Sequence, residues 1–567
     1  MVKAEILSIL EAVLRELGLE PPGPLQLDPP RDPRHGDLST NVALLLAKRS
    51  GTTPAALAQR LAERLRARAD LQAEVSLAGP GFINFRLHAG SLHEALRRLL
   101  EAGEHYGQSR TAAGVRLQLE FVSANPTGPL NVVSARAAAY GSTLAAMLRF
   151  CGAEVHCEFY VNDAGRQVEL LGASVRARLL ERRGEAADFP ADGYHGDYVG
   201  ELAAAMPAAA ATAALALPVA ASQSACAAFA VEHLLAAQQA DLERFGVRFE
   251  RWFRESELHA SGAVAETRRL LEASGHTYAQ DGAVFFRSTT WGDDKDRVLV
   301  RSDGTPTYFL ADAAYHRDKH ERGFHPVVDV WGPDHHGHVA RMQALARALG
   351  YPPDWLEVII VQMVRLFDAG ESVVMSKRAG QIVTLADLMA DVGADVAKYF
   401  FLMRQQSAHL DFDLDLARKK SDENPVYYVQ YAHARICSVL RKAAAAGLRL
   451  RVPERFLADE LGPAGSEDPA PEATALGRLE TEAEQALLKL LLDYGDLVQR
   501  AAAAREPHRL STYCEEVARA FHKFYHDHRV IQEDRELALA RLALCHATRR
   551  VLASALGLMS IAAPTTM

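Results

Sequence analysis

The stretch that most constrains the fold is residues 117–168, where a strand, a Gly/Pro loop, a helix and a second strand follow one another. Apolar residues alternate through 117–121 as in a strand, the loop at 123–129 breaks this alternation, and an Ala-rich helix runs from Val132 to about Arg149. Backbone N–H groups at such a helix start face an anion such as a phosphate. Many strand–loop–helix units bind nothing, so the pattern leaves both a nucleotide site and ordinary core packing open.

The first 110 residues read as a separate small α/β domain. The pattern predicts an amphipathic helix over 1–17, a helix around 41–49, another that begins at Pro54, and two short strands that turn at Pro80 and Gly81. This domain ends at about residue 110.

Strands and helices alternate over 111–415, which predicts a Rossmann-like parallel sheet of the doubly wound type. Residues from about 166 to 250 form a helical insertion that Pro207 and Pro218 divide, and we interpret it as an excursion without chemistry of its own. Over 416–567, apolar residues recur at spacings of three and four, which predicts an all-α bundle. The expected fold class is therefore α/β with an appended helical domain.

Composition excludes several classes of protein. No apolar run approaches the roughly 20 residues of a membrane span, so we expect a cytoplasmic protein without a membrane contact. The 6 cysteines lack Cys-x-x-Cys spacing, which favours buried thiols over a zinc site. A net charge of -9 argues against indiscriminate coating of nucleic acid, although a selective binder needs only local basic residues.

Five segments carry a resemblance to one family. The run Ser-x-Asn-Pro-Thr-Gly-Pro-Leu at 123–130 resembles the signature region of class I arginyl-tRNA synthetases, although Asn131, Val132, Val133 and Ser134 replace the His-Val-Gly-His tetrad of that family. Residues 374–380 resemble the Lys-Met-Ser-Lys-Ser loop and keep its second lysine as Lys377. Residues 35–41 with 80–85 resemble the family's N-terminal domain, which touches the outer corner of the tRNA, and residues 424–435 its anticodon-binding domain.

The resemblance implies the residues of an arginine site. A guanidinium is planar, always charged and best recognised by carboxylates. Tyr308 and Asp312 lie one helical turn apart and share a face. The positions that match arginine-binding residues of the family are Glu120, Asn125, Tyr308, Asp312 and Asp334.

The same resemblance implies an ATP site and a tRNA surface. The ATP-binding positions are Gly128, Pro129, Asn131, Ser134, His335, Met375, Ser376 and Lys377. Among these, Lys377, Asn131 and Ser134 are the catalytic candidates, and Lys377 is expected to stabilise charge on the departing pyrophosphate. Tyr431 and Arg435 are candidates for tRNA contact. Residues 335–338 are rich in histidine but lack further ligands at metal spacing, so we expect no protein metal site, and Mg²⁺ arrives with ATP.

The resemblance thus implies an arginine–tRNA ligase, which forms arginyl-adenylate from L-arginine and ATP and transfers the arginyl group to tRNA(Arg). We expect a monomer. The replaced tetrad leaves an alternative open, a non-catalytic relative that binds tRNA or arginine. A synthetase for another amino acid is disfavoured by the acids at Glu120, Asp312 and Asp334.

Overall fold

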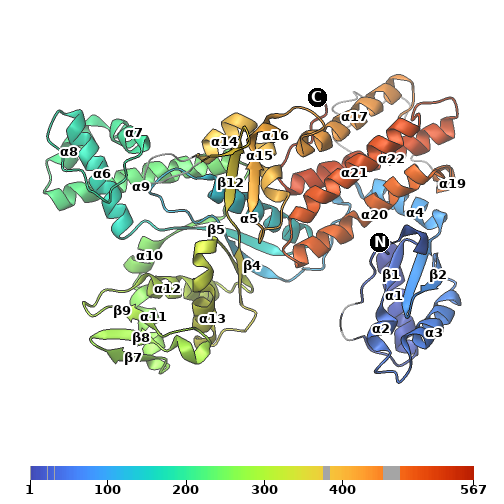
Figure 1. The fold of residues 1–567 in the computed structure, drawn as a ribbon, viewed down its shortest axis with the longest axis horizontal. Coiled ribbons are helices and arrows are strands. Elements are labelled where there is room, and N and C mark those ends of the chain that lie inside the picture. Colours follow the sequence, from blue (N-terminus) through green and yellow to red (C-terminus); the bar gives the residue numbers. More distant parts are fainter. Residues whose placement is uncertain (1, 22, 24, 31, 374–382, 451–472) are drawn as a thin grey trace.

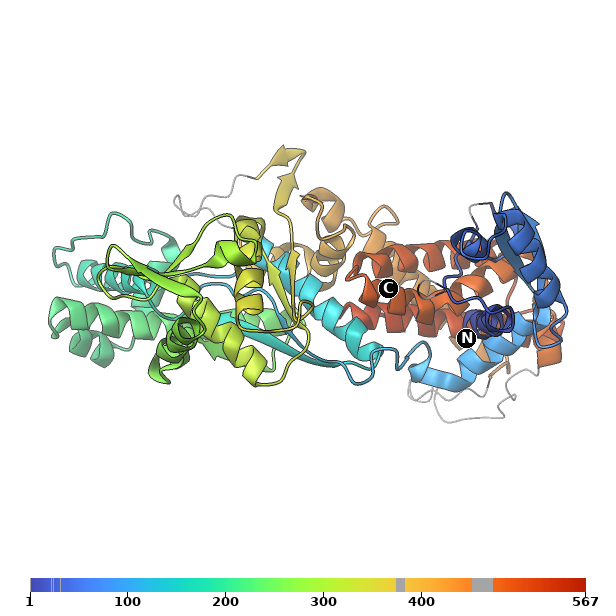
Figure 2. The ribbon, with the colours of Figure 1, turned by 90° about the horizontal axis from the view of Figure 1, so that it is seen from below.

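The structure is a computed structural model that describes residues 2–567 except 22, 24, 31, 374–382 and 451–472. Its parts follow one another along an extended molecule, with the parallel sheet in the middle, a helical insertion at one end, and the C-terminal helices with the N-terminal domain at the other (Figures 1 and 2). The expected fold class is confirmed.

The N-terminal domain packs helices on an antiparallel sheet. Strands β1 (Leu38–Thr40), β3 (Phe82–Leu87) and β2 (Ala73–Ala78) pair in that order. The helices are α1 (Val2–Glu16), α2 (Val42–Leu46) and α3 (Pro54–Arg66). Thr53 caps α3 by accepting from the Ala56 N–H at 3.3 Å, and Pro54 occupies the first turn, as its missing N–H allows. Helix α4 (Ala89–Ala102) leads on to the central sheet.

Asp37 joins this domain to the C-terminal helices. One carboxylate oxygen accepts from the Leu87 N–H at 2.8 Å, and the other accepts from the Lys489 Nζ at 2.6 Å. The preceding Gly36 has φ 124°, and a Cβ there would lie 2.7 Å from the Phe85 carbonyl oxygen. The segment around Asp37 therefore organises a turn and also docks one domain on another.

The central sheet has five parallel strands in the order β11 (Leu356–Ile360), β10 (Val327–Trp331), β4 (Arg116–Glu120), β5 (Glu154–Val161) and β6 (Arg251–Arg254). The expected helix after the first loop is α5 (Val132–Phe150). The sheet is further flanked by α10 (Glu255–Ala260), α11 (Ala263–Ala273), α12 (Tyr308–Glu321) and α13 (Val339–Ala348). A small antiparallel sheet, β7 (Thr277–Gln280), β8 (Ala283–Phe286) and β9 (Arg297–Val300), packs beside α12.

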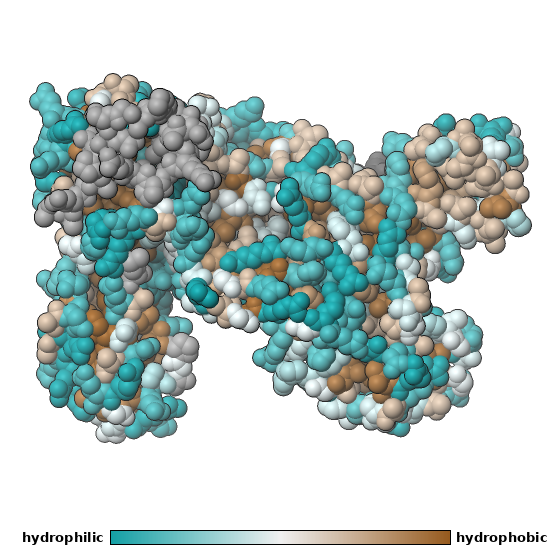
Figure 3. Space-filling view, turned by 180° about the vertical axis from the view of Figure 1, so that it is seen from behind, coloured by the Kyte–Doolittle hydropathy of each residue, from teal (hydrophilic) through white to brown (hydrophobic). Residues whose placement is uncertain are grey.

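The insertion consists of α6 (Arg166–Arg182), α7 (Asp197–Ala205), α8 (Ala208–Leu215) and α9 (Val219–Arg244). Pro207 and Pro218 immediately precede α8 and α9, as predicted. In Figure 3 weakly hydrophobic colours cover much of the projecting end of this insertion. Within the described chain, α9 is the one single helix that is long and apolar enough for a membrane span, but it packs against α6 and α8.

A second small sheet and a helical bundle complete the chain. Strand β12 (Val364–Asp368) lies between β13 (Glu371–Ser372) and β14 (Leu410–Asp413). The helices of this part of the chain are α14 (Leu385–Val392), α15 (Ala394–Leu402) and α16 (Leu414–Arg418). The bundle contains α17 (Pro425–Ala445), α19 (Ala473–Leu476), α20 (Glu482–Ala503), α21 (His508–Asp527) and α22 (Arg535–Leu558). The predicted apolar face of α21 is buried.

Candidate active site

Three acids lie side by side where strands β4, β5 and β10 are in register. Glu120 pairs with Asp329 on one side and with Glu158 on the other. The Asp329 and Glu158 side chains are fully buried, and Glu120 is nearly so. Because parallel strands place their carboxyl ends at one edge, this row concentrates negative charge beside the loop that follows β4.

A buried lysine neutralises part of this row. The Lys319 Nζ donates to Glu120 at 2.6 Å and to Asp329 at 2.7 Å, and its side chain is 0% exposed. Burial opposes the charged form, but the two carboxylates raise the pKa of Lys319 above its usual value. Burial also acts against ionisation of Asp329, yet Lys319 and His316 hold the pKa of Asp329 at about 2. Glu120 is fixed further by the Ser123 hydroxyl, which donates to it at 2.8 Å.

Tyr308 and Asp312 line one cavity of about 290 Å³ at the start of α12, as their spacing predicts. The cavity is also lined by Arg297, Val298, Arg301, Thr307, Phe309, His338 and Arg341. Tyr308 is 54% exposed at the mouth, and a Cβ on Gly165 would lie 3.1 Å from its hydroxyl. The mouth therefore faces the start of α6.

The Asp312 carboxylate has no hydrogen-bond donor among the residues that the structure describes. Burial raises the pKa of Asp312 to about 7, and the charges of Glu255, Glu120 and Asp329 add to this rise while His316 opposes it. Arg341 lines the same cavity and its charge acts on Asp312, so this half-buried carboxylate has a cation nearby but no hydrogen-bond donor in the described part of the chain. Its oxygens are therefore free to accept hydrogen bonds from a ligand.

A second acid near Asp312 was missed from the sequence. Glu255, at the start of α10, is 5% exposed and accepts from the Tyr160 hydroxyl at 3.0 Å. Burial raises the pKa of Glu255, and its charge acts on Asp312. The strand–helix junction before Glu255 was a signal that could have found it, because β6 ends one residue earlier.

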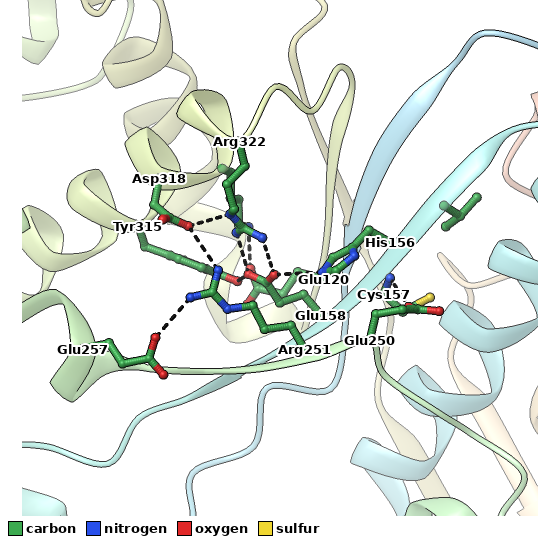
Figure 4. A network of polar contacts seen from close by, with 12 residues as sticks. Glu120, His156, Cys157, Glu158, Glu250, Arg251, Glu257, Tyr315, Asp318 and Arg322 are labelled. Atoms are coloured by element: carbon green, nitrogen blue, oxygen red, sulfur yellow. Dashed lines mark hydrogen bonds and ion pairs between the residues drawn. The ribbon is translucent and has the colours of Figure 1, made fainter.

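Behind the pocket, polar contacts fix β5 to α12 (Figure 4). Arg322 donates to both Glu158 oxygens at 2.7 and 2.9 Å, and the Tyr315 hydroxyl donates to Glu158 at 2.7 Å. Although burial opposes ionisation, His156, Arg322 and Tyr315 hold the pKa of Glu158 at about 2. The residues of α12 that meet these acids share one face, at positions 312, 315, 316 and 319, so helical periodicity from Asp312 could have identified Lys319.

The start of α5 differs from the expected anion site. The Asn131 side-chain oxygen accepts from the N–H groups of Val133 and Ser134 at 3.1 and 3.0 Å, so Asn131 is the N-cap of α5. This cap occupies two of the backbone donors that were expected to face a phosphate. The Asn131 amide group and the Ser134 hydroxyl, both partly exposed, are the side-chain donors that replace the tetrad here.

The other predicted site residues have mixed locations. The Asn125 amide donates to Gln167 at 2.7 Å, in the loop that also contains Gly128 and Pro129. The side chains of Asp334 and His335 are 80% and 52% exposed, whereas His338 lines the cavity. Met375, Ser376 and Lys377 lie outside the described residues.

No group of three or more His, Cys, Asp or Glu side chains at metal-binding geometry occurs in the described parts of the chain.

The tRNA candidates form an aromatic and cationic surface on α17. Arg435 is bonded to the Tyr431 hydroxyl and lies 5.2 Å from the Tyr431 ring centroid and 5.3 Å from that of Tyr525. The rings of Tyr427 and Tyr431 are nearly parallel at 6.4 Å. Both tyrosines are half-buried, so each keeps some ring surface for an unpaired base.

Comparisons with known proteins cover the whole chain. Residues 4–87 match the arginyl tRNA synthetase N terminal domain, residues 230–407 the catalytic domain of tRNA synthetases class I (R), and residues 429–567 the DALR anticodon binding domain. The arginine–tRNA ligase of Heliobacterium modesticaldum is 45% identical over 100% of this chain and 98% of its own length. That of Desulforudis audaxviator is 46% identical over 98% of this chain and 97% of its own length.

A solved structure shows the same fold. The arginyl-tRNA synthetase of Thermus thermophilus superposes with a TM-score of 0.77 at 23% identity and covers 100% of both chains. The identity to the curated relatives over the full length, together with the three matched domains, assigns the family. This chain belongs to the class I arginyl-tRNA synthetases.

Proposed function

We propose that this chain ligates L-arginine to tRNA(Arg) with ATP, through an arginyl-adenylate. The observation that carries the proposal is the cavity around Asp312, a carboxylate without a donor in a chain that is 45% identical over its full length to an arginine–tRNA ligase. The match to the catalytic domain over 230–407 favours this ligase over the non-catalytic alternative.

In this proposal the guanidinium of arginine lies between Asp312 and Glu255, with Tyr308 over it at the mouth. Two carboxylates offer the charge and the acceptor pairs that a guanidinium fork requires. Glu120 is held by Lys319 and Ser123, so it supplies a fixed negative field for the α-ammonium group. Asn125 completes that side of the site, and Asp334 is assigned to the outer rim of the pocket.

ATP is assigned to the loop and helix start between β4 and α5. Gly128, Pro129, Asn131, Ser134 and His335 surround the nucleotide in this assignment, with Met375, Ser376 and Lys377 on its phosphate side. The arginine carboxylate attacks the α-phosphate, and Lys377 stabilises the charge that develops on the leaving pyrophosphate. The terminal ribose hydroxyl of the tRNA then takes the arginyl group, so catalysis is mainly orientation and charge stabilisation.

The remaining partners follow from the same proposal. Mg²⁺ enters as the MgATP complex, held by phosphates and few protein ligands. The tRNA anticodon loop lies on Tyr431 and Arg435 of α17. We retain the division into domains at about residues 110 and 415, a monomeric state and a cytoplasmic location as parts of the proposal.

Charging of tRNA with purified protein tests the function. With ATP, Mg²⁺ and a mixed tRNA pool, we expect radiolabelled arginine to become acid-precipitable, and lysine under the same conditions to remain free. Binding of tRNA without any arginyl-adenylate or arginyl-tRNA would favour the non-catalytic alternative.

Arginine binding is expected to depend on pH. The pKa of Asp312 is about 7 in the empty pocket, and a bound guanidinium favours the ionised carboxylate, so that pKa falls on binding. Affinity is then constant well above pH 7 and declines by up to about tenfold per pH unit as the pH falls through 7. Calorimetry in buffers of different ionisation enthalpy should record release of about half a proton per arginine at pH 7. An affinity unchanged from about pH 6 to pH 8 would contradict this role of Asp312.

A further inference from the structure

Three helices of the insertion contact the loop between β4 and α5. From α9, the Gln238 Nε2 donates to the carbonyl of Gly128 at 2.9 Å and to that of Asn125 at 3.3 Å. From α7, the Tyr198 hydroxyl donates to the Thr127 carbonyl at 2.9 Å. From α6, Gln167 accepts from the Asn125 amide at 2.7 Å.

These contacts matter because the loop has little support of its own. Across residues 124–129, no backbone group bonds to another backbone group of the residues that the structure describes. Pro126 and Pro129 also lack an N–H donor. At its start, Val122 and Ser123 adopt φ 70° and 39°, a left-handed conformation that non-glycine residues rarely hold without outside support. The insertion side chains therefore determine where three loop carbonyls and the Asn125 amide lie.

The insertion is suited to hold the loop rigidly. Helix α9 contributes Cys226, Ala230 and Leu234 to the insertion's own hydrophobic core, and Leu235 and Leu242 to the core of the catalytic sheet. Gln238 lies on this continuous helix and is 1% exposed. Helices α6 and α9 are in close contact at Gly172, where a Cβ would lie 2.2 Å from the Gln223 carbonyl oxygen.

Tyr198 is a stable donor at the other side of the loop. Burial raises the pKa of its hydroxyl, so the hydroxyl keeps its proton at neutral pH. Its ring lies 3.6 Å from the place of a Cβ on Gly128, which is ordinary packing distance. The ring and the hydroxyl together fix the backbone at Thr127 and Gly128.

We propose that the insertion positions the substrate loop for the reaction, and that Tyr198, Gln238 and Gln167 are its positioning residues. This inference rests on the proposed function, in which the same loop holds arginine and ATP. It also assigns a role to a segment whose sequence predicts none. A displacement of about 1 Å of reacting groups can lower a rate by about two orders of magnitude, so the contacts act on turnover.

The test is the double variant Tyr198→Phe with Gln238→Met, which keeps both side-chain volumes and removes three hydrogen bonds to the loop. Arginine-dependent ATP–pyrophosphate exchange is measured with tRNA present. We expect kcat to fall roughly tenfold or more, with the KM values for arginine and ATP within about threefold. Hydrogen–deuterium exchange of the peptide covering 121–131 should become faster.

Ser222→Ala is the matched control. Ser222 is buried on α9 and accepts from Arg176 of α6 at 3.1 Å, so the variant loses a hydrogen bond of the insertion without touching the loop. An equal loss of kcat in this control would overturn the proposal, as would unchanged hydrogen–deuterium exchange of the loop in the double variant. If wild-type protein shows no arginine-dependent ATP–pyrophosphate exchange, the proposed function fails. The hydrogen–deuterium measurement still decides in that case whether the insertion holds the loop.

Discussion

Lys319→Met is expected to lower the melting temperature by roughly 6–20 °C, which corresponds to a loss of about 3–5 kcal/mol from a broken buried ion pair. Lys319 is 0% exposed and donates to Glu120 and Asp329. Methionine fills a similar volume but leaves two neighbouring carboxylates buried without their cation. Calorimetry or circular dichroism of the purified variants measures the shift.

The loss should shrink as the pH falls. Without Lys319, the two acids have folded-state pKa values above those of the unfolded chain, so protonation favours the folded state and stability declines as the pH rises. A second substitution, Asp329→Asn, should recover part of the loss by removing one of the two charges. A deficit that is the same at pH 5 and pH 8 would contradict this explanation.

Lys398→Met provides the comparison. Lys398 is also buried, but its Nζ donates to a carbonyl, that of Ser560 at 2.7 Å, and burial lowers its pKa to about 8. Its removal leaves no buried carboxylate without a partner, so we expect a cost of at most about 2 kcal/mol. Equal losses in the two methionine variants would mean that Lys319 contributes packing and not charge compensation.

Local pattern was enough to predict most elements of the fold. Apolar periodicity predicts α1 and α21, the prolines mark the starts of α3, α8 and α9, and the capping residue Asn131 marks the start of α5. Each of these signals acts within a few residues of the chain, where steric limits and capping hydrogen bonds are decided.

The polar interior could not be predicted in this way. Lys319 meets Glu120 across 199 residues of chain, and Gln238 meets Gly128 across 110. Such contacts depend on strand order, which places β10 beside β4 although many elements separate them in the sequence. A lysine on a helix usually lies in solvent, so its burial becomes visible only when the acids that surround it are located.

Resemblance to a family supplied a different part of the site. It selected Asp312 and Tyr308, which share a cavity, and also Asp334, which lies exposed beside His335. It did not select Glu255, Asp329 or Lys319, because these residues act through contacts that a short motif does not contain. The compensation of charge among these buried acids therefore had to come from the structure.

Asp312→Asn is expected to raise the KM for arginine by roughly 10- to 150-fold, the range for losing a charged hydrogen bond of about 1.5–3 kcal/mol. The KM for ATP should change by less than about twofold, since the cavity lies at α12 and the proposed ATP site lies at the start of α5. Initial rates of ATP–pyrophosphate exchange with each substrate varied in turn measure both constants. Asp318→Asn, which changes an acid of the same helix that pairs with Arg322, should leave the arginine KM nearly unchanged.

The stability of the Asp312→Asn protein without bound arginine separates a loss of arginine contact from misfolding. Burial raises the pKa of Asp312 from 3.8 to about 7, so the wild-type protein loses stability as the pH rises from about 4 to 7 and the full cost is present above 7. Asparagine carries no charge, and the Asp312→Asn protein should therefore be at least as stable as the wild type at pH 8. Its remaining arginine affinity should also lose the decline below pH 7. A variant that melts earlier and loses ATP and arginine use together would instead show that Asp312 supports the fold, and the guanidinium would have to be assigned to another carboxylate.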